Sequence, residues 1–300
     1  MSETLIALEG TEAGSTLAMA LALLAAFLHA VFGALQKGRH DPWLTRGAID
    51  FWLVVLSLPI ALFLVPWPEG RVWWLLVGGL GIHFVYKLGM ALAYARGAFT
   101  VVYPVVRGMG PLFTVIGAWL IFGESFSLVQ WAGVGVLLAG IFGLAVYNLI
   151  HVDVGRETLV PALWLAVGTG ALVALYTTYD AYGIRATPNP FTFLAWFFLI
   201  TAVDFPGLAY LRWRSMVIRP PVRPLLRRGF IGALVAYGSF GSVMLATRLD
   251  KVGEAAVLRE TSTVFAALIG WLVLRETVGP RRIALMALIA AGAVIVEIGG

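Results

Sequence analysis

The sequence has no cysteine, and this absence excludes disulfide bonds, thiolate metal ligands and cysteine nucleophiles. Charged residues are also scarce, since only 12% of the 300 residues are Asp, Glu, Lys or Arg while 60% are hydrophobic. A soluble domain normally carries about 25% charged residues. A chain of this length cannot hide so much apolar surface in one aqueous core, so its composition predicts that a lipid bilayer surrounds most of it.

Several functional motifs are missing as well. There is no Walker A motif, so ATP is not expected to drive the protein directly. There is also no HExxH, GxSxG or Asp-rich motif that would indicate a membrane enzyme, and no metal or cofactor site is predicted. The net charge of +5 lies mainly in short loops, where basic residues report membrane orientation, so nucleic acid is not an expected partner.

The N-terminal segment is acidic and lacks the basic start and cleavage site of a signal peptide. We expect residues 1–15 to form a polar tail and the first hydrophobic helix to direct insertion. This pattern is typical of a multi-pass protein of the cell inner membrane.

Ten hydrophobic segments follow, each with the roughly 20 residues that a helix needs to cross a bilayer core. Short loops separate them, and the longest loop, at residues 212–228, carries six arginines. The pattern predicts an all-α integral membrane protein with ten transmembrane helices. The expected spans are residues 16–36, 47–66, 72–95, 98–122, 128–150, 159–182, 190–211, 229–247, 254–274 and 281–298.

The second half of the chain repeats the first. Shifting the sequence by 152 residues places 96–140 over 248–292 without a gap, and Arg107 then falls on Arg259. Matching arginines do not follow from hydrophobicity alone, so we interpret the match as a duplication.

The duplicated unit contains five helices, at residues 16–150 and again at residues 159–298. Because five is an odd number, the second copy must enter the membrane upside down relative to the first. Two inverted repeats with a site between them are the usual architecture of secondary transporters.

The segment at residues 91–141 also resembles a known protein family. It carries the early prolines, the loop Gly-Glu and the late glycine that are typical of the EamA-type module of the drug/metabolite transporter superfamily: Pro104, Pro111, Gly123, Glu124 and Gly140. The second copy keeps only the Glu and the late glycine, as Glu276 and Gly292. The resemblance implies ten helices, a central cavity, and export or exchange of amino acids, nucleotide-like compounds or other metabolites.

Loop charges bear on the orientation of the protein. Fourteen of the 21 Lys and Arg residues fall in loops on one side of the predicted helices and four on the other side. The positive-inside rule places the richer side in the cytoplasm, and both termini would then lie outside. The family resemblance implies termini inside, so the two arguments are opposed, and the charge bias favours the outside location.

Ionisable residues inside the predicted helices mark a candidate substrate site. A charge at the bilayer centre costs at least about 2.5–3.5 kcal/mol, so such residues face a cavity or a partner. Arg107 and Arg259 are repeat mates and would converge near the midplane. The predicted substrate-binding residues are His83, Tyr86, Lys87, Tyr94, Tyr103, Arg107, Arg259 and Glu260.

Some of these residues also have structural interpretations. The arginines can be fixed in internal salt bridges or can reach toward the interface. We expect His83 and His29 to be hydrogen-bonded packing residues rather than proton carriers. Asp204 is expected to cap a helix that restarts near Pro206, and Asp180 to lie at the membrane interface.

The predicted fifth helix carries small residues at four-residue spacing, which suits close helix packing: Gly135, Ala139 and Gly143. We interpret this stripe as packing within one molecule. Whether the protein is a monomer or a homodimer stays open.

The charges inside the helices favour one class of function. The first helix has no Asp or Glu of the kind with which small multidrug relatives bind cations, and the excess is basic. We therefore expect a secondary transporter that exports or exchanges a small anionic or zwitterionic metabolite, such as an amino acid or organic acid. It would work by alternating access around a central cavity, coupled to a proton or a counter-substrate. A carrier or flippase for a lipid-linked or phosphate-bearing substrate is the alternative, and a membrane enzyme is the third interpretation.

Overall fold

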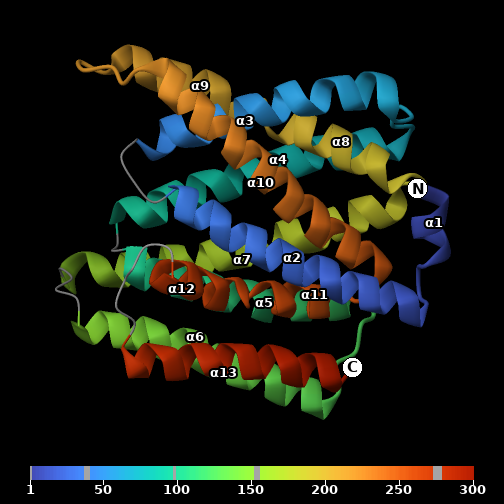
Figure 1. The fold of residues 1–300 in the computed structure, drawn as a ribbon, viewed down its shortest axis with the longest axis vertical. Coiled ribbons are helices and arrows are strands. Elements are labelled where there is room, and N and C mark those ends of the chain that lie inside the picture. The colour runs from blue at the N-terminus through green and yellow to red at the C-terminus, as the bar shows by residue number, and fades with distance from the viewer. Residues whose placement is uncertain (1, 37–40, 97–98, 152–155, 273–278) are drawn as a thin grey trace.

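The computed structural model describes residues 2–36, 41–96, 99–151, 156–272 and 279–300, and these residues form helices with no strand among them (Figure 1). The predicted all-α class is therefore confirmed. The elements are α1 (Ser2–Ala7), α2 (Glu12–Gln36), α3 (Pro42–Pro59), η1 (Ile60–Leu64), α4 (Arg71–Arg96), α5 (Phe99–Phe122), α6 (Leu128–His151), α7 (Arg156–Ala186), α8 (Pro190–Thr201), α9 (Asp204–Ser215), α10 (Val222–Leu249), α11 (Val252–Arg259), α12 (Ser262–Leu272) and α13 (Pro280–Ile298).

Eight stretches of helix in the described part of the chain are long and apolar enough to cross a membrane. They coincide with the first eight segments expected from the sequence. The ninth segment is divided into α11 and α12, and α13 carries Arg281, Arg282 and Glu297 near its ends. The protein is thus a multi-pass membrane protein.

Two of the predicted continuous segments are interrupted. Between α8 and α9 the helix stops at Thr201 and restarts at Asp204, whose Oδ1 accepts a hydrogen bond from the Phe205 amide at 2.8 Å. Between α11 and α12, the hydroxyls of Thr261 and Thr263 donate to the carbonyls of Leu258 and Glu260 at 2.7 and 2.8 Å. The amides of Thr261 and Thr263 donate to the same two carbonyls at 3.1 Å, so the chain makes tight turns between α11 and α12.

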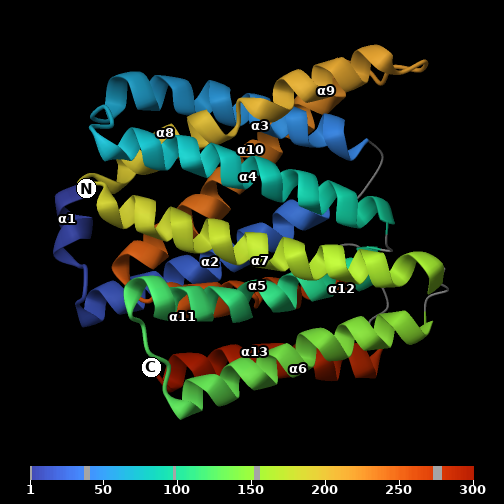
Figure 2. The same ribbon diagram turned by 180° about the vertical axis from the view of Figure 1, so that it is seen from behind.

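The helices pack in pairs that join distant parts of the sequence. α6 lies against α13, α2 against α10, and α7 against both α4 and α5 (Figures 1 and 2). α3 contacts α8, α9 and α10, while α11 and α12 contact α2. Because these contacts connect the two halves of the chain, the described helices form one bundle.

The tightest pair, α6 with α13, packs through glycines. A Cβ atom at Gly140 would lie 2.8 Å from the Leu285 carbonyl oxygen, and one at Gly133 would lie 2.8 Å from the Gly292 carbonyl oxygen. Of the stripe expected from the sequence, only Gly143 meets α13, because Gly135 and Ala139 are exposed. Small residues of α6 therefore do pack closely against another helix, but they lie on a different face of α6 from the predicted stripe.

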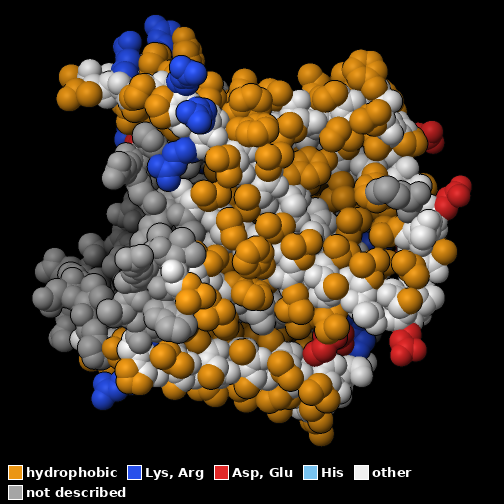
Figure 3. All heavy atoms as spheres, viewed as in Figure 1, with side chains coloured by type: hydrophobic (Ala, Val, Ile, Leu, Met, Phe, Trp, Pro, Cys, Tyr) orange, Lys and Arg blue, Asp and Glu red, His pale blue; other side chains and the backbone are white. Residues whose placement is uncertain are grey.

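The two ends of the bundle differ in charge. Both termini lie at the same end (Figures 1 and 2). The opposite end carries the hairpin between α9 and α10, where Lys and Arg side chains gather (Figure 3). The exposed arginines of this hairpin are Arg212, Arg214, Arg219, Arg223, Arg227 and Arg228. The acidic segment predicted as a polar tail contains α1. Glu9, which follows α1 in this segment, pairs with Arg248 at 2.5 Å.

Candidate functional site

A buried ion pair lies where α5 meets the break between α11 and α12. The Arg107 Nε atom lies 2.9 Å from Oε2 of Glu260, and the side chains are 8% and 2% exposed. Nη2 of the same guanidinium donates to the Ser262 hydroxyl at 2.6 Å and to the Arg259 carbonyl at 3.4 Å. On the other side, Nη1 lies 3.5 Å from Nε2 of His29 on α2. Two of the predicted site residues, Arg107 and Glu260, are thus brought together at one point.

The helix break makes this arrangement possible. In an unbroken helix the Arg259 carbonyl would accept the amide of the residue four positions later. Here the chain turns at Glu260 and Thr261, so that carbonyl and the Ser262 hydroxyl face Arg107 instead. Broken helices at membrane depth are tolerated where protein or a polar cavity satisfies the freed backbone groups.

Arg259, the repeat mate of Arg107, differs from it in one respect. The residue is only 5% exposed, yet its Nε has no hydrogen-bond partner among the described residues. The neighbouring Glu260 carboxylate is already occupied by Arg107. Two guanidinium groups therefore share one carboxylate here, which leaves an excess positive charge in a buried place.

Lys87 lies in a second buried cluster. Its Nζ donates to Oδ2 of Asp50 at 3.0 Å, to Oδ1 of Asp204 at 2.8 Å and to the Thr201 carbonyl at 2.8 Å. Asp50 also pairs with Arg46 one helical turn earlier, at 2.9 Å. The three donors of Lys87 are thus used within the protein, whereas the sequence predicted that Lys87 would contribute to the substrate site.

His83 pairs with Asp180 on α7, with Nε2 and Oδ2 2.8 Å apart. Its ring packs against Tyr176 and Phe197 at centroid distances of 4.7 and 5.0 Å. This agrees with the expectation that His83 is a hydrogen-bonded packing residue. The interface position predicted for Asp180 is wrong, because it is 4% exposed and its carboxylate satisfies the buried histidine.

The predicted tyrosines are placed only in part. Tyr86 is half-buried on α4, with its ring 4.8 Å from that of Tyr176. Its hydroxyl interacts electrostatically with Arg46 of one charged cluster and with Arg107 and Arg259 of the other. The side chains of Tyr94 and Tyr103 lie outside the described residues, and their predicted role stays a prediction.

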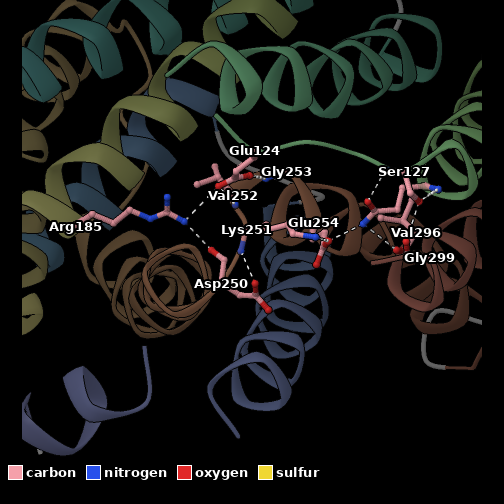
Figure 4. A network of polar contacts seen from close by, with 11 residues as sticks. Glu124, Ser127, Arg185, Asp250, Lys251, Val252, Gly253, Glu254, Val296 and Gly299 are labelled. Atoms are coloured by element: carbon pink, nitrogen blue, oxygen red, sulfur yellow. Dashed lines mark hydrogen bonds and ion pairs between the residues drawn. The ribbon is translucent and has the colours of Figure 1, made fainter. Parts of the chain in front are cut away.

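A third polar network closes the end of the bundle near the C-terminus (Figure 4). The Glu124 carboxylate, in the loop after α5, accepts the Val252 and Gly253 amides at 2.9 and 3.1 Å. Arg185 joins it, donating to Glu124 at 3.3 Å and to the Asp250 carbonyl at 2.7 Å. Glu124 is thus a cap for the start of α11.

Asp50 and Ser262 belong to these clusters but were not among the predicted site residues. Asp50 lies in the middle of an apolar segment and is 0% exposed, and a carboxylate in such a segment is itself a signal of a buried partner. Ser262 carried no such signal, because its contact with Arg107 depends on a helix break that hydrophobic periodicity does not show.

Comparisons with known proteins agree with the membrane-transport interpretation. The model of the EamA-like transporter family matches residues 160–298, close to the second repeat expected from the sequence. An uncharacterized transporter of Synechocystis sp. is 23% identical over 201 residues, which is 66% of this chain. An uncharacterized protein of Sinorhizobium fredii is 36% identical over 69 residues, which is 23% of this chain. The chain spans 59% of the length of each of these relatives.

One solved crystal structure superposes on the chain with a TM-score of 0.70 at 18% identity. The superposition covers 95% of this chain and 98% of the other. At this identity the likeness shows the fold alone. The family match shows that residues 160–298 are similar to an EamA-like transporter domain.

Proposed function

We propose that the protein is a secondary transporter of a small anionic or zwitterionic metabolite, such as an amino acid or organic acid, in the cell inner membrane. The observation that carries this proposal is the buried Arg259, whose Nε lacks a hydrogen-bond partner among the described residues. Arg259 shares the Glu260 carboxylate with Arg107, and a buried guanidinium whose charge is only partly compensated is costly, so the site favours binding of an anion. A substrate carboxylate would supply that anion.

The proposal includes two inverted five-helix repeats and ten membrane crossings. Helix contacts support it, because they keep the same pattern when the two halves are exchanged. The contact of α2 with α10 corresponds to the contact of α7 with α4 in the exchanged arrangement. In the same way, the contact of α3 with α10 corresponds to the contact of α8 with α4. α12 packs on α2 as α5 packs on α7, and α6 packs on its own counterpart, α13. Such symmetry supports the proposal that Arg107 and Arg259 lie on either side of an axis between the halves.

The chemistry of the site favours a substrate with both charges. Guanidinium groups bind carboxylates in a planar, bidentate fashion, and Arg259 is available for this. Glu260 is held by Arg107 in the described structure, and it is the carboxylate nearest to a substrate ammonium. When a substrate carboxylate approaches the arginines, Glu260 can turn to the ammonium, so an amino acid matches both groups. A phosphate would match the arginines alone.

A ligand-induced shift in melting temperature tests this proposal. The protein in detergent or nanodiscs would be heated with single amino acids, with citrate, malate and succinate, and with glycerol phosphate and short-chain phosphatidic acid. A ligand at 100 times its Kd stabilises the folded state by about 2.7 kcal/mol, which gives a measurable shift. Stabilisation by amino acids or organic acids is expected, whereas stabilisation by the phosphates alone would favour a carrier of phosphate-bearing substrates.

Two variants make the same experiment specific. Arg259→Ala should melt normally without ligand but lose the ligand-induced shift. Arg223→Ala removes an equally long cation from the exposed hairpin and should keep the shift. The proposal fails if Arg259→Ala keeps the full shift.

A further inference from the structure

The cluster around Lys87 is built like an ion-binding cage with an ammonium group in place of the ion. Three oxygens surround Nζ within 3.0 Å, and they come from the Asp50 carboxylate, the Asp204 carboxylate and the Thr201 carbonyl. The Phe205 ring covers the group at 5.0 Å from its centroid. We propose that this cage is the proton-coupling site of the transporter, with Lys87 Nζ as the group that releases and takes up the proton; this rests on the transport function proposed above.

The charges around the cage explain why loss of one proton matters. The cage is faced by Asp50 and Arg46 from α3 and by Asp204 from α9. α8 contributes the Thr201 carbonyl and has no ionisable side chain. On α4 itself, His83 pairs with Asp180 of α7, and Tyr86 interacts electrostatically with Arg107 of α5. With Lys87 charged, two cations balance two carboxylates. When Nζ loses a proton to water, Arg46 alone faces both carboxylates, and they repel one another.

The cage is attached to elements that can move. Thr201 and Asp204 flank the break between α8 and α9, while Asp50 and Lys87 belong to unbroken helices. The protonated lysine therefore ties the broken helix to α3 and α4. After deprotonation the three hydrogen bonds lose their charge assistance, and the break is free to change its angle.

The geometry also offers a path for the proton. Asp50 is 0% exposed and Lys87 5%, whereas the Asp204 side chain is 11% exposed. Oδ2 of Asp204 is buried and has no hydrogen-bond partner among the described residues, because Oδ1 accepts from both Lys87 and the Phe205 amide. A proton that leaves Nζ can pass along its hydrogen bond to Oδ1 of Asp204, the most exposed carboxylate of the cage, and then to solvent, which leaves neutral Lys87 and regenerates ionised Asp204.

Tyr86 connects the cage with the substrate arginines. It follows His83 and precedes Lys87 on α4, and its hydroxyl interacts electrostatically with Arg46 of one charged cluster and with Arg107 and Arg259 of the other. Protonation of the cage and binding of an anion at Arg259 thus act on one short stretch of α4. This is the physical link that coupling between proton and substrate requires.

The absence of cysteine permits a direct test. Ala202, in the break beside the cage, is 2% exposed, so Ala202→Cys should react slowly with a water-soluble thiol reagent while the cage is closed. Ser215→Cys, at the exposed end of α9, corrects for the higher thiolate fraction at high pH. We expect the reactivity ratio of the two sites to rise about tenfold from low to high pH, as Lys87 loses its proton.

Two lysine variants make the result specific. Lys87→Arg keeps a cation that does not deprotonate, so the ratio should stay low at both pH values. Lys87→Met removes the cation, so the ratio should stay high at both pH values. A ratio in the Lys87-containing protein that does not change with pH, or a pH response that survives in Lys87→Arg, would overturn the proposal.

Proteoliposomes loaded with a pH-sensitive dye separate this proposal from the transport function. Each compound that stabilises the protein against heat would be added outside in turn. The Lys87-containing protein should move protons, and Lys87→Arg should keep the ligand-induced melting shift but move none. Equal proton movement in both proteins, or none in either, would overturn the coupling role, whereas loss of the melting shift in every protein would overturn the transport proposal itself.

Discussion

Arg107 donates a hydrogen bond to the backbone carbonyl of Arg259, the residue that occupies its own position in the second half of the chain, 152 residues later. The same guanidinium pairs with Glu260 at 2.9 Å. Both arginines of the matched pair thus lie around the Glu260 carboxylate, and Nε of Arg259 has no hydrogen-bond partner among the described residues. This arrangement makes the buried point at the junction of α5, α11 and α12 suited to an anion.

The Arg107–Glu260 pair should contribute strongly to stability. Glu260→Gln would leave two buried guanidinium groups without a carboxylate, and breaking a buried pair on one side costs about 3–5 kcal/mol. We expect the free energy of unfolding, measured by titration with a denaturing detergent, to fall by about that amount. Glu12→Gln, at an exposed position on α2, is the control and should change it by less than about 0.5 kcal/mol. Equal stability of the two variants would contradict the pairing.

The cap at the start of α11 predicts a local effect. Glu124→Ala removes the acceptor of the Val252 and Gly253 amides, and loss of a helix cap costs about 0.5–2 kcal/mol. Hydrogen exchange of the amides at residues 252–256 should accelerate about 10-fold, while exchange in α3 stays unchanged. Glu69→Ala, at an exposed carboxylate, is the matched control. Unchanged exchange at the start of α11 would show that Glu124 does not cap it.

Glycines on the two sides of α6 provide a test of the packing with α13. A valine at Gly140 would collide with the backbone of α13, and overpacking of this kind costs about 1–3 kcal/mol. Gly135→Val adds the same atoms to the same helix where nothing lies within 4 Å. We expect thermal unfolding of Gly140→Val well below that of Gly135→Val. The reverse order would mean that another face of α6 contacts α13.

Orientation follows from the arrangement of the charged ends. Both termini lie at the end opposite the arginine-rich hairpin, and the positive-inside rule places that hairpin in the cytoplasm (Figures 1 and 3). A reporter that is active only in the cytoplasm should therefore be inactive when fused after Gly300. The same reporter inserted after Val217, at the exposed tip of the hairpin, should be active. Activity after Gly300 and inactivity after Val217 would establish the opposite orientation.

Much of the fold could be predicted from the sequence, because lipid requires long apolar helices and leaves a strong signal. The first eight spans and the meeting of Arg107 with the Arg259 backbone follow from hydropathy and from the repeat. The sequence also predicts the restart of a helix near Asp204, whereas the break at residues 259–262 does not follow from it, since apolar character continues across that break. The partners of Lys87 could not be predicted either, because Asp50 and Asp204 reach it only through packing of distant helices.

The most direct test of the account is uptake by proteoliposomes of a labelled compound that stabilises the purified protein against heat. Arg107→Ala and Arg259→Ala should be made alongside Arg223→Ala, and all three should fold into the same vesicles. We predict that transport falls at least about 100-fold in Arg259→Ala, because a lost charge-assisted contact of this kind costs about 2.7–4 kcal/mol. Arg107→Ala should also lose transport, and Arg223→Ala should transport normally. Full transport by both Arg107→Ala and Arg259→Ala would contradict the central claim.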